Sequence, residues 1–200
     1  MRFVISVHGF KSNTNRYIVK ECSLITLDGE ALYHWIVKSP FQLSELDHSR
    51  RREASHVTHR VHGLSWDDGD IEYGDWVNSL KTLADRAETI YAKGKEIALF
   101  LSTLLGVAVT NVEDLGCPAL KNLTGPALEC LHHRLAQSSV TNCALVNASL
   151  VRHWLFNYEH PADSGSSANS SDFDESLRSR SATKHNSRSM WYCSKFGSRK

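Results

Sequence analysis

The order in which apolar strands and helices follow one another constrains this chain more than any other feature. Three β-rich segments come first, at 3–7, 18–27 and 31–37, and the Asp28-Gly29 pair between the last two is typical of a hairpin turn. The later apolar segments alternate, as helix 75–88, strand 89–92, helix 96–105, strand 107–112 and helices 126–137 and 142–158. An antiparallel meander followed by strands joined through helices predicts an α/β fold with a mixed five-stranded sheet flanked by helices.

The composition changes near Pro161 and divides the chain into two parts. Over the whole 200 residues, 41% hydrophobic and 22% charged residues are typical of a globular protein. From residue 159 on, serine, small and charged residues dominate and apolar periodicity is absent. Such a segment buries too little to offset its ordering entropy. We therefore expect one domain over 1–158 and a disordered, Ser-rich tail over 159–200.

Charge, cysteine count and hydropathy limit the cellular compartments and the kinds of partner that we expect for this protein. The formal net charge is +1, so any nucleic-acid surface must be a local patch. The opening is too short and polar for a signal peptide, and no apolar run approaches a membrane span. Five cysteines, an odd number, then favour free or metal-bound thiols. The expectation is an intracellular protein, cytoplasmic or nuclear, with no membrane partner.

The ordered part resembles the DEDDh 3′–5′ exonucleases, which have a ribonuclease-H-like fold. In that comparison Ser6 and His8, in the first strand, stand where the family has its Asp-x-Glu pair. Asn142 and Asn147, at the last helix, stand where the family has a histidine and an aspartate. Only Glu96 is acidic near the position of the remaining aspartate. Two-metal hydrolysis needs several carboxylates around two divalent ions, so the resemblance implies a catalytically inactive relative.

A second pattern, Cys130-x-x-His133 followed by Cys143, has the spacing of a zinc site. Cys130 and His133 lie three residues apart on one face of the helix expected over 126–137, and Cys143 opens the next helix. The spacing supplies only three of the four ligands that a structural zinc requires. His132 is the neighbouring alternative to His133. Cys117 is a candidate fourth ligand.

This pattern resembles the Maelstrom domain, a ribonuclease-H-like domain of animal small-RNA pathways that uses a Glu-Cys-His-Cys set. The resemblance covers about 1–158 and includes no high-mobility-group box. It implies that Glu21, in the hairpin strand 18–27, is the fourth ligand and that the cofactor is zinc. Cys22 is expected to face away from Glu21, because side chains alternate along a strand.

The polar segments between the elements carry weaker signals. Arg50, Arg51 and Arg52, in a basic segment over 41–62 that reads as a loop, can contact a phosphate backbone or simply be solvated. Trp66, in a polar connection, is a candidate platform for base stacking. The acidic residues Asp67, Asp68 and Asp70 are typical of a turn rather than of a metal cluster.

Together these patterns predict a catalytically inactive exonuclease-fold module with a structural zinc, which binds single-stranded RNA or a protein partner. One alternative is a single-stranded RNA nuclease that acts without the DEDDh carboxylates. The other is a purely protein-interaction module of a viral or mobile-element protein.

Overall fold

The computed structural model describes residues 1–126, 128–135 and 142–161 of the chain. Its sheet consists of β1 (Arg2–Lys11), β2 (Tyr17–Thr26), β3 (Leu32–Ile36), β4 (Thr89–Ala92) and β5 (Val109–Asn111), in the spatial order β3-β2-β1-β4-β5. The pairs β1–β2 and β2–β3 are antiparallel, whereas β1–β4 and β4–β5 are parallel. The expected α/β fold with a mixed five-stranded sheet is therefore confirmed.

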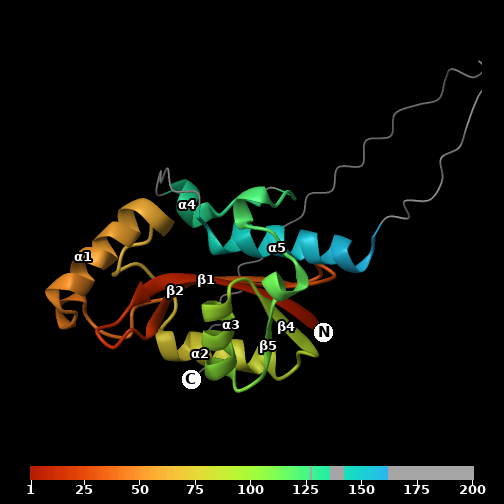
Figure 1. Cartoon of the computed structure of the whole chain (residues 1–200). Helices are drawn as coiled ribbons and strands as arrows, with labels where there is room; N and C mark the ends of the chain where they lie inside the picture. The colour runs from red at the N-terminus through yellow and green to blue at the C-terminus, as the bar shows by residue number, and fades with distance from the viewer. Residues whose placement is uncertain (127, 136–141, 162–200) are drawn as a thin grey trace, which may run out of the picture. The chain divides into compact units, whose positions relative to one another are not determined.

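Helices cover both faces of this sheet. Figure 1 shows α2 (Tyr73–Ala84) and α3 (Lys95–Leu105) on one face and α5 (Ala144–Glu159) on the other, with α1 (His48–Val57) beyond one end of the sheet. A π-helical turn (Thr58–His62) extends α1, and the short α4 (Leu131–Leu135) precedes α5. Short 3-10 turns at Leu43–Glu45, Val112–Leu115 and Leu120–Asn122 complete the described elements.

The core follows from the alternation of side chains along the strands. In β1, Phe3, Ile5 and Val7 face α2 and α3, where they pack with Trp76 and Leu80. Val4 points to the other face, into a second cluster that includes residues of α5. The result is three layers, with one apolar interface on each side of the sheet.

An irregularity in the β1–β2 pairing adjusts this alternation. His8 pairs with Glu21, but Gly9 pairs with Val19, so Lys20 is an extra residue on β2. Its ammonium group is fully buried and donates to the carbonyl groups of Trp66 and Asp68. Lys20 thus ties the turn after α1 to the sheet.

The same irregularity brings the Ile18 backbone so close to position 9 that only glycine fits there. A Cβ atom at Gly9 would lie 1.9 Å from the Ile18 carbonyl oxygen, so no larger residue fits there without moving the backbone.

Two sequence predictions need correction. The basic segment 41–62 is not a loop, because α1 and the π-helical turn occupy it from His48 to His62. Helix 126–137 was predicted too early: only Leu131–Leu135 is helical among its described residues, and Pro126 opens no helix. Residues 162–200 of the expected tail lie outside the described residues. So do residues 136 and 137, the last two of the expected helix 126–137.

Candidate metal centre

Four buried side chains meet beneath the start of α5. Glu21 comes from β2, Cys130 directly precedes α4, His133 lies on α4 and Cys143 is the N-cap residue of α5. One ligand atom from each lies within 4.8 Å of the others. These are the four residues that the spacing and the family resemblance predicted as ligands, although Cys130 lies just before the helix rather than on it. Their convergence is compatible with a single metal ion.

Glu21 accepts hydrogen bonds on both of its carboxylate oxygens. Its Oε1 accepts from His34 Nε2 at 2.8 Å and from the Cys143 thiol at 3.2 Å. Its Oε2 accepts from the backbone N–H of Ala144 at 2.9 Å. Glu21 therefore joins β2, β3 and the first turn of α5.

His133 is oriented as metal-bound histidines usually are. Its Nε2 lies 2.7 Å from the carbonyl oxygen of His62, to which it donates. Its other ring nitrogen, Nδ1, lies 3.2 Å from Cys130 Sγ and 3.8 Å from Glu21 Oε1. The hydrogen bond to the backbone carbonyl thus leaves Nδ1 as the ring nitrogen that points at the other ligands.

The electrostatics of the group without a metal show which protons an ion would displace. Burial opposes ionisation of Glu21, but the hydrogen bonds from His34 and Ala144 outweigh it and lower its pKa to about 2. The hydrogen bond with Cys143 and the contact with His133 lower the pKa of Cys130 to about 4. Conversely, the hydrogen bond to Cys130 raises the pKa of His133 to about 9, against burial. The hydrogen bond with Cys130 and burial both raise the pKa of Cys143.

The alternatives to these ligands lie elsewhere. Cys22 faces the opposite side of the sheet, as expected, within the core beneath α2. Cys117 belongs to an apolar cluster with Val112 and Leu123 and is not part of the group. The Nε2 atom of His132 points toward Asp68, 3.9 Å from its carboxylate.

The positions compared with exonuclease carboxylates line a nearby cavity of about 220 Å³. Ser6, His8 and Asn147 all border it, and Asn147 Nδ2 donates to His8 Nε2 at 3.1 Å. Lys93, at the end of β4, borders it as well, and no carboxylate is among its lining residues. Asn142 is exposed before α5 and does not line it.

Glu96 does not contribute a carboxylate to this cavity. It is exposed on α3 and pairs with Lys11 at 2.7 Å.

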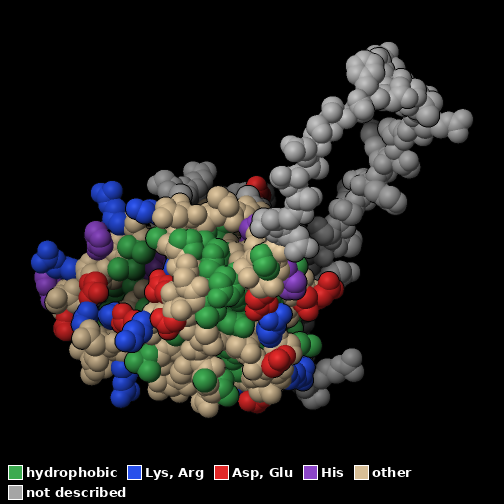
Figure 2. Space-filling model, turned by 45° about the vertical axis from the view of Figure 1, so that its right-hand side comes forward, with side chains coloured by type: hydrophobic (Ala, Val, Ile, Leu, Met, Phe, Trp, Pro, Cys, Tyr) green, Lys and Arg blue, Asp and Glu red, His purple; other side chains and the backbone are tan. Residues whose placement is uncertain are grey.

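The basic residues of 41–62 lie on a helix. Asp47 caps α1 by accepting from the backbone N–H of Arg50. Arg51 and Arg52 are exposed, while the Arg50 side chain is tied to Glu53 and Asn15. Figure 2 shows Lys, Arg and His side chains at the end of the molecule where α1 lies, with acidic side chains among them.

Trp66 is not a base-stacking platform. It is 3% exposed, packs between Phe10 and Phe41 and donates its indole N–H to the Phe41 carbonyl. The acidic residues that follow it form a turn, in which Asp68 accepts from the backbone N–H of Ser65.

Sequence reasoning missed two histidines near the metal centre. His34 holds Glu21 from the neighbouring strand, and the His62 carbonyl holds His133. Strand alternation places His34 on the face of Glu21, so a hairpin register would have found it. No local pattern identifies His62, because its role depends on the π-helical turn.

Comparisons with known proteins identify no relative. No protein-family model matches the sequence, and neither a curated protein nor a solved structure matches it. Among the described residues, no helix is both long and apolar enough to cross a membrane.

Proposed function

We propose that this chain is a catalytically inactive, Maelstrom-like module of ribonuclease-H-like fold, which holds one structural zinc and binds single-stranded RNA. The observation that carries the proposal is the convergence of Glu21, Cys130, His133 and Cys143, since the first is more than a hundred residues away from the others in sequence.

Zinc is the ion that suits this group best. Two thiolates and an imidazole are borderline-soft donors, and a carboxylate completes a tetrahedral set of the kind found in structural zinc sites. All four residues are buried, which leaves no open coordination position for a substrate. The ion would join β2 to α4 and α5 and so stabilise the domain. The four described cysteines are free thiols, which suits a reducing, intracellular compartment.

The sheet supports the ribonuclease-H-like part of the proposal. An antiparallel three-stranded meander continued by two parallel strands, in the order β3-β2-β1-β4-β5, is the arrangement expected for that fold. The cavity lined by Ser6, His8 and Asn147 supports the loss of catalysis. A lysine and neutral groups border it, and these do not replace the carboxylates that a pair of Mg²⁺ ions needs.

The exposed arginines of α1 and its π-helical extension support binding to RNA. Arg51, Arg52 and Arg60 are exposed on α1 and its π-helical extension. Arginine side chains on one helix contact successive phosphates without reading sequence. The net charge of +1 makes this a local surface rather than a property of the whole chain.

Two assays on the full chain test this function. Purified protein with Mg²⁺ or Mn²⁺ is expected to bind a labelled single-stranded RNA without shortening it from the 3′ end. Metal-dependent 3′–5′ trimming would contradict the inactive assignment, provided that a Ser6→Ala, Asn147→Ala variant loses it. Absence of binding at low salt would contradict the assignment to RNA.

A further inference from the structure

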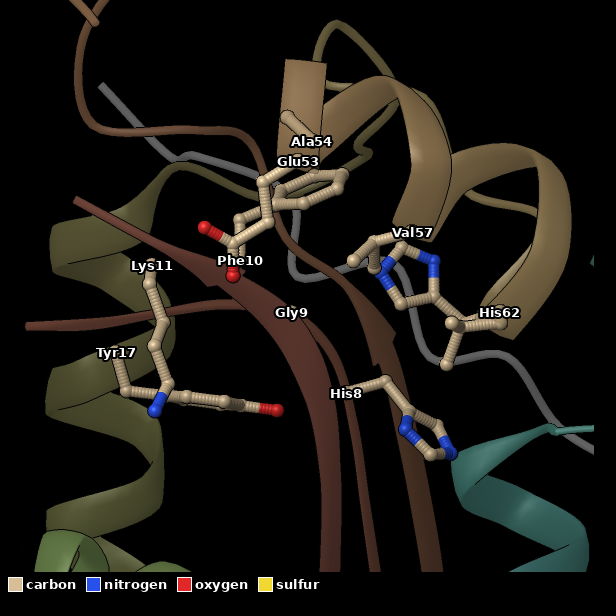
Figure 3. A pocket seen from close by; sticks show the side chains of 10 residues that line it. His8, Gly9, Phe10, Lys11, Tyr17, Glu53, Ala54, Val57 and His62 are labelled. Carbon is tan, nitrogen blue, oxygen red and sulfur yellow. The ribbon is translucent and has the colours of Figure 1, made fainter. Parts of the chain in front are cut away.

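A second cavity, of about 190 Å³, lies on the other side of His8, between β1 and the α1 segment. It is bordered by His8, Phe10, Tyr17, Val57, Val61 and His62, among others. Figure 3 shows the labelled side chains around a common space: His8 and Phe10 come from β1, Tyr17 from β2, Val57 from α1 and His62 from the π-helical turn. The metal ligands do not line it.

His62 presents an unpaired donor to this space. The residue is 1% exposed, and its Nδ1 accepts from the backbone N–H of Leu64 at 3.1 Å. The ring proton must then be on Nε2, which lies near the Gly9 backbone but has no partner in hydrogen-bond geometry. In Figure 3 the ring of His62 directs this nitrogen toward the middle of the cavity. A buried donor without a partner is unfavourable, and an acceptor atom of a ligand would satisfy it.

Two further donors face the same space. His8 Nε2 accepts from Asn147, which leaves the proton on Nδ1, and Figure 3 shows that nitrogen on the side of Tyr17. The Tyr17 hydroxyl has only a long contact, 3.5 Å, to the Val7 carbonyl. Three donors from three different elements therefore converge, and a complementary ligand must be rich in acceptors.

The walls select a flat, neutral ligand over an anion. Phe10, Val57 and Val61 are apolar, and the Phe10 ring meets His62 edge-on at 5.0 Å. Both charged side chains that border the cavity are already paired, Lys11 with Glu96 and Glu53 with Arg50. A phosphate would therefore find no free lysine or arginine among the lining residues, whereas a pyrimidine ring offers carbonyl acceptors and an apolar face.

We propose that this cavity binds one unstacked uracil base of a single-stranded RNA whose phosphates lie along α1. The inference rests on the RNA binding proposed above and names the part of the RNA that this site takes. Ala54 and Val57 border the cavity from α1, and the exposed Arg51 and Arg52 lie on the same helix, so one strand can contact both.

Anisotropy with a labelled uridine 12-mer and with an abasic 12-mer of the same backbone tests the proposal. Val61→Phe fills the cavity, and Val107→Phe, at an exposed valine before β5, is the matched control. Val61→Phe is expected to weaken binding of the uridine 12-mer about tenfold, in the range for one stacked base. It should leave both the salt dependence and the binding of the abasic strand unchanged. Tyr17→Phe removes one donor while keeping the ring, and is expected to weaken uridine binding by a smaller factor.

A second measurement separates this inference from the proposed function. Free uridine, added to isotope-labelled protein, should shift the imidazole signals of His8 and His62 in the wild type and in Val107→Phe but not in Val61→Phe. If RNA binds, Val61→Phe and Tyr17→Phe have no effect on it and uridine shifts neither signal, the cavity proposal is overturned and RNA binding stands. If no RNA binds but uridine shifts both signals, the cavity takes a uracil base that is not part of an RNA strand, and the proposed function fails. If neither occurs, both are wrong.

Discussion

Glu21→Gln removes the negative charge and one acceptor oxygen of Glu21 while it keeps the size of the side chain. The wild-type carboxylate accepts on both oxygens, from His34 and Cys143 on one side and from the Ala144 N–H on the other. A glutamine amide accepts on one side only. Its NH₂ group replaces either the oxygen that accepts from His34 and Cys143 or the oxygen that accepts from Ala144, so at least one buried hydrogen bond is lost.

The expected magnitudes differ with and without metal. Losing one buried acceptor costs the metal-free domain about 1–3 kcal/mol, or a fall of roughly 4–8 °C in Tm for a loss near the middle of that range. Structural zinc contributes roughly 10–16 kcal/mol through four ligands, so replacing the carboxylate by a neutral amide is expected to cost about 3 kcal/mol of binding. That loss corresponds to zinc affinity about a hundredfold weaker.

The assay combines zinc competition against a chromophoric chelator with thermal unfolding in excess chelator. Glu96→Gln is the control, because that carboxylate is exposed and pairs with Lys11 on the surface; surface pairs of this kind contribute about 0–1 kcal/mol. Zinc affinity within about twofold of the wild type in Glu21→Gln, together with an unchanged Tm in chelator, would refute the reasoning.

The remaining predictions concern pH and salt. In the metal-free protein at neutral pH, Cys143 and His133 hold protons that an ion must displace, so zinc affinity should rise by up to about a hundredfold per pH unit between pH 6 and 8; a flat profile in the chelator competition would contradict this. Without the metal, the raised pKa of His133 stabilises the protein fully below about 6.5, the usual pKa of histidine, and no longer above about 9. The free energy of unfolding of the metal-free protein should therefore fall as the pH rises through that window. Denaturant titrations at pH 6 and 9, in excess chelator, would measure it. Replacing Arg51 and Arg52 together by alanine should lower the slope of log K against log salt for single-stranded RNA by about 1.4, whereas an unchanged slope would show that α1 does not contact phosphates.

The strands were predictable because their signals are local. The segment 89–92 is a short apolar run closed by Lys93-Gly94, and β4 has those bounds. Helix α1 was missed because only Ala54 among its residues is buried, which leaves almost no apolar periodicity to detect. The usable signal was Asp47, whose side chain caps the helix.

The metal centre was predictable only in part from spacing. Cys130, His133 and Cys143 lie close in sequence, so local spacing links them. Glu21 reaches them only because β2 lies beneath α5, a long-range arrangement that residue spacing does not contain, and its assignment depended on the family resemblance. The uracil cavity had no sequence signal, since it depends on the extra residue Lys20 in β2 and on the π-helical turn that positions His62.

X-ray absorption at the zinc edge on the purified, full-length protein tests the central claim most directly. We expect about one zinc per chain with two sulfur ligands at about 2.3 Å and one nitrogen and one oxygen ligand at about 2.0–2.2 Å. In Cys143→Ser the sulfur contribution should fall by half or the metal should be lost, whereas Cys117→Ser should leave the spectrum unchanged. A protein purified with zinc in the buffer that holds no metal, or a shell with three sulfur ligands that loses one in Cys117→Ser, would contradict the Glu21-Cys130-His133-Cys143 site.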